Sequence, residues 1–200
     1  MIEMLLYDIG ILWSIGSYDG ERFVFRHKCR YYLERMQVYY PNEIYLQNRI
    51  KNKIDDKHFV LKTTNIDFNS LSELRWTNRN ADIRELPVLS DYRDFIRAYI
   101  ELHSTLDYSK RTTRSGETYR ALRLRIYGNK CIISNMANIL HDTCGVGLKQ
   151  PQLMYNKKTS TLYYQDANEI KQLLDYVQDK PKYPLFWDDA MSKISVPLIK

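Results

Sequence analysis

The sequence predicts an α+β protein in which one order of elements, helix–strand–strand–helix–strand–strand–helix, occurs twice. Two observations carry this prediction. Each half of the chain begins with an apolar segment at helical spacing, and segments in which polar and apolar residues alternate follow it. The chain also holds 17 tyrosines against seven glycines and six prolines, and tyrosine at this density suits half-exposed sheet surfaces. A chain of 200 residues is long enough for two such half-domains sharing a core.

The first half of the order begins with an apolar helix that includes Leu5 and Ile9. Pro41 ends the second helix, and Asp67 or Asn69 is suited to cap the third. The predicted elements are, in order, a helix at 2–15, a strand at 21–27, a helix at 29–39, hairpin strands at 43–51 and 58–64, and a helix at 67–76.

The second half repeats this order after a polar connector. A polar tip around Gly116 separates its first two strands, and Asp166 with Glu169 forms a capping-box pattern at its last helix. The predicted elements are a helix at 91–103, strands at 105–111 and 118–127, a helix at 130–141, strands at 149–156 and 161–165, and a helix at 166–178. We therefore expect a first half-domain at 1–80, a linker at 81–90, a second half-domain at 91–180, and a C-terminal tail at 181–200 that packs on the body.

Composition restricts the class of protein. The formal net charge of +6 favours an anionic partner, for which nucleic acid is the default. No apolar run is long enough to span a membrane, and Glu3 and Asp8 interrupt the N-terminal apolar run, which argues against a secretory signal. Cys29, Cys131 and Cys144 are odd in number and widely spaced, so we expect reduced thiols, a cytoplasmic location and no zinc site. The abundance of Lys, Asn, Ile and Tyr favours a bacterial or phage origin.

Two short helical stretches, at 8–16 and 95–104, carry small residues in mid-helix. Gly10 and Ala98 leave room for a second backbone to approach closely. We expect the two helices to pack against each other and to form the interface between the half-domains. The candidate interface residues are Gly10, Ser14, Ala98 and Leu102.

At these two stretches the sequence resembles the LAGLIDADG homing-endonuclease family. The residues that fit the family's small and apolar motif positions are Gly10, Ile11, Leu12, Ser14 and Gly16 in the first stretch and Ala98, Tyr99, Ile100 and Glu101 in the second. The resemblance covers about residues 1–180. It implies a duplicated αββαββα fold whose antiparallel sheets lie along the DNA major groove, with helices on the other face. It also implies an Asp or Glu near the foot of each motif helix that holds divalent metal for phosphodiester cleavage.

Ile15 and His103 stand where the family's two catalytic acids would fall. A two-metal hydrolase needs carboxylate oxygens beside the phosphate, and isoleucine offers none while a lone imidazole is a poor magnesium ligand. We therefore expect no catalytic residue, no metal and no other cofactor, and whether the protein is an enzyme stays open. We interpret the nearby Asp19, Glu101 and Asp107 as solvated charges or strand-edge groups rather than metal ligands.

The alternation of the strand at 118–127 indicates which sheet face is free. Leu122, Leu124 and Ile126 point one way, and Arg123 and Arg125 point the other. Arginine can pair with guanine and glutamine with adenine in the major groove, while basic hairpin tips contact phosphate. The candidate DNA-binding residues are Arg22, Arg26, Tyr45, Gln47, Arg49, Lys51, Lys62, Lys110, Arg111, Arg114, Arg123, Arg125, Gln152, Lys157 and Lys158.

These observations favour a catalytically inactive LAGLIDADG-like protein that binds double-stranded DNA sequence-specifically as a transcriptional regulator. We expect a monomer with internal pseudo-twofold symmetry, associated with the nucleoid and with no membrane. Three alternatives remain. They are a divergent homing endonuclease with relocated metal ligands, a maturase-like protein that binds structured RNA, and a protein-interaction module whose basic face is incidental.

Overall fold

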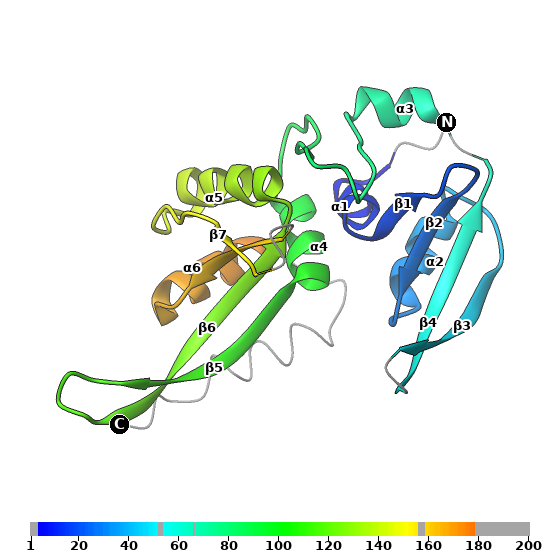
Figure 1. Ribbon diagram of the computed structural model, residues 1–200. Coiled ribbons are helices and arrows are strands. Elements are labelled where there is room, and N and C mark those ends of the chain that lie inside the picture. Colours follow the sequence, from blue (N-terminus) through cyan, green and yellow to red (C-terminus); the bar gives the residue numbers. More distant parts are fainter. Residues whose placement is uncertain (1–3, 52–53, 66, 156–158, 179–200) are drawn as a thin grey trace. The chain divides into compact units, whose positions relative to one another are not determined.

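The computed structural model describes residues 4–51, 54–65, 67–155 and 159–178, with 49–51 and 54–56 described by their backbone alone (Figure 1). The chain divides into two compact units, Met1–Leu102 and His103–Lys200. The predicted tail at 181–200 lies outside the described residues. No helix within the described ranges has the length and apolar character needed to cross a bilayer.

The first unit contains a four-stranded antiparallel sheet in the order β1-β2-β4-β3. Its elements are α1 (Leu6–Ile15), β1 (Gly16–Tyr18), β2 (Phe23–His27), α2 (Tyr31–Gln37), β3 (Ile44–Lys51), β4 (Ile54–Thr63), α3 (Phe68–Glu73) and α4 (Arg93–His103), whose last residue begins the second unit. The buried Phe23 anchors the core, since its ring lies 5.8 Å from that of Tyr40 and 4.7 Å from that of Trp76. Asp67 caps α3, as predicted, by accepting the backbone N–H groups of Asn69 and Ser70.

The second unit contains a sheet in the order β5-β6-β8-β7, also antiparallel. Its elements are β5 (Ser104–Thr112), β6 (Thr118–Gly128), α5 (Lys130–Cys144), β7 (Gln152–Leu153), β8 (Ser160–Tyr164) and α6 (Ala167–Val177). Leu122, Leu124 and Ile126 are buried on the face that α5 and α6 cover, whereas the β5–β6 hairpin extends beyond these helices (Figure 1). The hairpin is therefore a long two-stranded ribbon attached to a packed base.

The element order predicted from the sequence is confirmed, with two local differences. The predicted order has two strands between the first two helices, but the sequence located only the one at 21–27, because β1 has three residues and these are too few to show alternation. β7 spans only two residues instead of 149–156, and Pro151 directly before it has no N–H to donate to a ladder.

The half-domain boundaries at 80 and 91 stay a prediction. They follow the repeat of element order, whereas the two compact units follow spatial proximity. α4 begins the second repeat but belongs, except for His103, to the first compact unit.

Candidate nucleic-acid interface

The two motif stretches form α1 and α4, and these helices approach each other closely. A Cβ atom built at Gly10 would lie 2.7 Å from both the Cβ of Ala98 and the backbone oxygen of Phe95. Only glycine leaves room for this approach. Ser14 is buried in α1, and Leu102 is half-buried in α4. Whether these helices also form a half-domain interface stays a prediction.

A fully buried ion pair lies on α4, and Tyr7 of α1 contacts it. Arg97 Nε donates to Glu101 Oε1 at 3.2 Å, and the side chains of both residues are 0% exposed. The Tyr7 hydroxyl also donates to Glu101, and the Tyr32 hydroxyl lies 3.4 Å from the same Oε2. Burial raises the pKa of Tyr7, and the Glu101 carboxylate raises it further. The interpretation of Glu101 as a solvated or strand-edge charge is therefore wrong, because the carboxylate is buried and paired. We call Arg97 and Glu101 the sealed pair.

The residues at the expected catalytic positions do not fit a divalent metal. Ile15 and His103 are each the last residue of their helix, directly before β1 and β5. Ile15 is only 5% exposed and carries no ligand atom. Within the described ranges, no group of three or more His, Cys, Asp or Glu side chains is arranged to hold a metal ion. The donor set at these helix ends therefore lacks the oxygen ligands that the family's chemistry requires.

A second buried carboxylate, Asp8 of α1, is also held by side chains of its own unit. It accepts from Arg35 Nη2 at 2.5 Å and from the Tyr39 hydroxyl at 2.7 Å. These contacts fix α2 and the residues after it against α1.

The polar face of the first sheet brings together four of the candidate residues. Arg26 on β2 donates to Gln47 Oε1 on β3 at 3.1 Å. Lys62 Nζ on β4 lies 5.8 Å from the ring centroid of Tyr45 on β3, within cation–π range. All four side chains are half-buried, and strand register places them on one face. Arg49 and Lys51 lie on β3, but their side chains are outside the described residues.

Arg22 does not belong to this strand face, in contrast to the prediction. β2 begins at Phe23, and Arg22 lies in the preceding turn, where it is exposed and pairs with Asp19 at 3.7 Å. Asp19 Oδ1 accepts the backbone N–H groups of Glu21 and Arg22. The Asp19 side chain therefore stabilises the turn. Gly20 in the same turn has a φ of 103°, which favours glycine.

The polar face of the second sheet carries a three-residue cluster. Arg123 Nε and Nη2 donate to Asp107 Oδ1 and Oδ2, both at 3.0 Å, and Arg125 Nη2 donates to Oδ2 at 2.5 Å. The Arg123 hydrogen bonds hold the pKa of the Asp107 carboxyl below its usual value, and Asp107 raises the pKa of Arg123. We call Asp107, Arg123 and Arg125 the Asp107 cluster.

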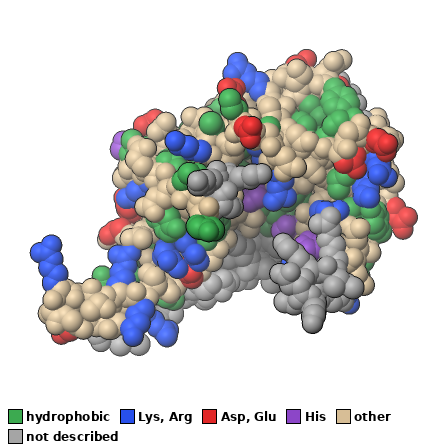
Figure 2. Space-filling model, in the orientation of Figure 1, with side chains coloured by type: hydrophobic (Ala, Val, Ile, Leu, Met, Phe, Trp, Pro, Cys, Tyr) green, Lys and Arg blue, Asp and Glu red, His purple; other side chains and the backbone are tan. Residues whose placement is uncertain are grey.

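Further basic candidates lie along the protruding hairpin. Lys110 and Arg114 are exposed, and Arg111 is half-buried on the face of the Asp107 cluster. Figure 2 shows Lys and Arg side chains gathered on this ribbon. Gln152 is exposed on β7, while Lys157 and Lys158 lie outside the described residues.

Asp107, interpreted from the sequence as a solvated or strand-edge charge, is paired with Arg123 and Arg125 on the sheet face. The sequence predicts a polar tip around Gly116 between the strands at 105–111 and 118–127, and the observed register pairs Thr112 with Thr118 and therefore Asp107 with Arg123. Cross-strand charge pairing was the available signal. Alternation along a single strand does not show this pairing, because the pairing depends on the register between two strands.

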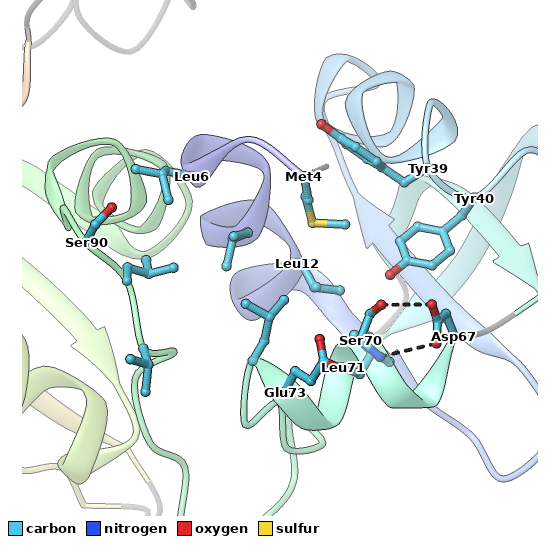
Figure 3. Close-up of a pocket in the computed structure, with 14 residues that line it drawn as sticks. Met4, Leu6, Leu12, Tyr39, Tyr40, Asp67, Ser70, Leu71, Glu73 and Ser90 are labelled. Carbon is cyan, nitrogen blue, oxygen red and sulfur yellow. Dashed lines mark hydrogen bonds between the residues drawn. The ribbon is translucent and has the colours of Figure 1, made fainter. Parts of the chain in front are cut away.

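An apolar pocket of about 690 Å³ lies elsewhere in the first unit, and no strand residue lines it (Figure 3). Met4, Leu12 and Leu71 contribute to its apolar wall, and Asp67 and Ser70 are hydrogen-bonded to each other at its rim. The pocket is separate from the polar sheet faces.

The sequence matches no protein-family model and no curated protein. Solved structures do match its fold. The meganuclease I-SmaMI bound to uncleavable DNA aligns with a TM-score of 0.63 and 8% identity over 96% of this chain and 89% of that chain. The LAGLIDADG homing endonuclease I-LtrWI bound to target DNA aligns with a TM-score of 0.62 and 10% identity over 97% and 90%. The LAGLIDADG homing endonuclease I-GzeII in complex with its DNA target aligns with a TM-score of 0.56 and 10% identity over 96% of this chain and 90% of that chain. This chain therefore has the LAGLIDADG homing-endonuclease fold.

Proposed function

We propose that this chain binds double-stranded DNA sequence-specifically through the polar faces of its two sheets and acts as a transcriptional regulator. The observation that carries the proposal is common to both units. Each antiparallel sheet buries one face in its core and presents arginine together with other polar side chains on the other. Long polar side chains on paired strands suit the major groove, where arginine and glutamine pair with base edges. The DNA-bound structures that share the fold support the same assignment.

We further propose that the protein binds DNA without cutting it. Ile15 ends α1 with a buried apolar side chain where the metal-holding acid is expected, and His103 ends α4. Neither side chain supplies the carboxylate oxygens for two-metal hydrolysis. In this proposal the protein is a cytoplasmic, nucleoid-associated monomer with pseudo-twofold symmetry, and its half-domains at 1–80 and 91–180 meet along α1 and α4.

Selection from a random duplex library, with and without Mg²⁺, tests the proposal. We expect enrichment of one sequence class, affinity that falls with salt, and no nicking of a plasmid carrying the selected site in Mg²⁺ or Mn²⁺. Absence of salt-dependent duplex binding, or stronger binding to structured RNA than to the selected duplex, would contradict DNA as the partner. Metal-dependent nicking would contradict the absence of cleavage.

A further inference from the structure

The Asp107 cluster leaves part of each arginine available to a ligand. Arg123 uses Nε–H and one Nη2–H in its two hydrogen bonds to Asp107. A guanidinium has five N–H donors, so three remain for Arg123, two on Nη1 and one on Nη2. One N–H of Nη1 and the remaining N–H of Nη2 are parallel and form a second two-donor edge, next to the edge that Asp107 occupies. The Arg123 side chain is 26% exposed and that of Asp107 32%, so the cluster is open to solvent on one side.

The free edge matches one base in particular. In the major groove, guanine presents the acceptors O6 and N7 side by side, and a bidentate arginine pairs with both. Adenine presents an acceptor beside an amino donor, which repels one arm of the guanidinium. An arginine that presents two parallel donors therefore discriminates between the two purines.

Asp107 also holds the arginine before any DNA arrives. A free arginine side chain loses rotamer freedom when it binds, which lowers its affinity for a base edge. The two 3.0 Å hydrogen bonds from β6 to β5 fix the guanidinium plane in advance. The cluster also carries two positive charges against one negative charge, so it attracts phosphate less than two unpaired arginines would. Both effects favour base recognition over backbone contact.

We propose that Asp107 is a specificity-determining residue, which orients Arg123 so that its free guanidinium edge pairs with a guanine in the major groove. This inference rests on the proposed function and deepens it. Asp107 acts through Arg123 and is therefore a positioning residue. Arg125, which shares Oδ2, supports the same carboxylate from the next position on that strand face.

The experiment compares wild type with Asp107→Asn and Arg123→Lys by selection from random duplex DNA. Asp142→Asn is the matched control, because it removes the same charge from an exposed position on α5. The selected site is then measured with guanine, 7-deazaguanine or adenine at each position that guanine occupies. 7-Deazaguanine keeps Watson–Crick pairing but lacks N7.

At one guanine, we expect wild type and Asp142→Asn to lose about tenfold or more in affinity on either replacement, as for a bidentate contact. Asp107→Asn and Arg123→Lys should lose less than about threefold there, since neither keeps the fixed bidentate geometry. Asp107→Asn should still bind random duplex at least as tightly as wild type, because it removes a negative charge.

Retention of the full guanine preference by Asp107→Asn would overturn the inference while leaving DNA binding intact. A wild-type protein that binds duplex with no guanine preference would overturn it as well. A wild-type protein that does not bind duplex at all would instead overturn the proposed function. The free energy of unfolding of each variant, measured by denaturant titration, separates these outcomes from misfolding.

Discussion

Two arginine–carboxylate clusters among the described residues, the sealed pair and the Asp107 cluster, differ in their access to solvent. In the sealed pair, Arg97 and Glu101 lie 3.2 Å apart, and both side chains are 0% exposed. In the Asp107 cluster, Asp107 contacts two arginines at 2.5–3.0 Å, and the three side chains are 25–32% exposed. The bonds are of similar length, so distance does not distinguish the two sites.

Because the two arginine–carboxylate sites differ in exposure, we expect them to have different roles. A buried ion pair has lost its hydration, and removal of one partner leaves an uncompensated charge in the core. A half-exposed pair contributes little to stability, but its unused donors can reach a ligand. We therefore expect the sealed pair to stabilise the contact between α1 and α4, and the Asp107 cluster to serve the proposed recognition of DNA.

The largest expected effect is on the sealed pair. Glu101→Ala leaves the Arg97 guanidinium buried without its carboxylate, so we expect the free energy of unfolding to fall by about 3–5 kcal/mol. Denaturant titration followed by circular dichroism measures this loss. Duplex affinity, corrected for the folded fraction, should remain that of wild type. A loss below about 1 kcal/mol, which is typical of an exposed pair, would place Glu101 with the solvated charges after all.

The second-largest effect on stability is expected from a substitution at the contact between α1 and α4. In Gly10→Ala the new methyl group would lie 2.7 Å from Ala98 Cβ and from the Phe95 oxygen. We expect a loss of about 1–3 kcal/mol from overpacking, partly offset by the better helix propensity of alanine. Thermal unfolding measures the change. A variant more stable than wild type would mean that the helices do not approach as described.

A substitution on the polar face of the first sheet should lower the affinity for duplex DNA, with little change in the free energy of unfolding. Arg26→Ala removes a charge and the hydrogen bond to Gln47, and we expect about 1–3 kcal/mol less duplex binding free energy. Lys130→Ala, at an exposed position of α5, is the control. It should change the duplex binding free energy by less than half as much as Arg26→Ala does. Equal losses in both variants would indicate general electrostatic attraction and no specific sheet contact.

The smallest effect is expected at the hairpin tip. Arg114 is exposed in the turn between β5 and β6, where a phosphate contact adds affinity without specificity. Arg114→Ala should reduce the slope of log affinity against log salt by about 1, equally for all duplex sequences. Titrations at several salt concentrations measure this slope. A changed sequence preference would instead assign a base contact to Arg114.

Much of the fold could be predicted from the sequence, because its signals are local. Alternation located β6, the capping residues Asp67 and Asp166 located the starts of α3 and α6, and Gly10 indicated the close approach of α1 to α4. These features depend on residues a few positions apart or on the absence of a side chain.

The partners of the charged residues could not be predicted in the same way. Glu101 and Asp107 are equally hydrophilic in the sequence, yet Glu101 is sealed by Tyr7 and Tyr32, which lie far from it along the chain. In the sequence, Arg22 continues the alternation of the strand predicted at 21–27. In the structure β2 begins at Phe23, because Arg22 belongs to the turn that Asp19 stabilises. Burial and pairing of charges depend on tertiary contacts, which periodicity does not encode.

The most direct test is the affinity of Arg123→Glu with Arg125→Glu for a selected duplex, compared with Lys130→Glu with Lys171→Glu. Both double variants change the net charge equally, but only the first lies on a sheet face. If the sheet binds DNA, the first variant should lose about 100-fold or more in affinity at low salt, and the second should lose at most a few-fold. Equal affinities for the two variants would contradict DNA recognition by this sheet.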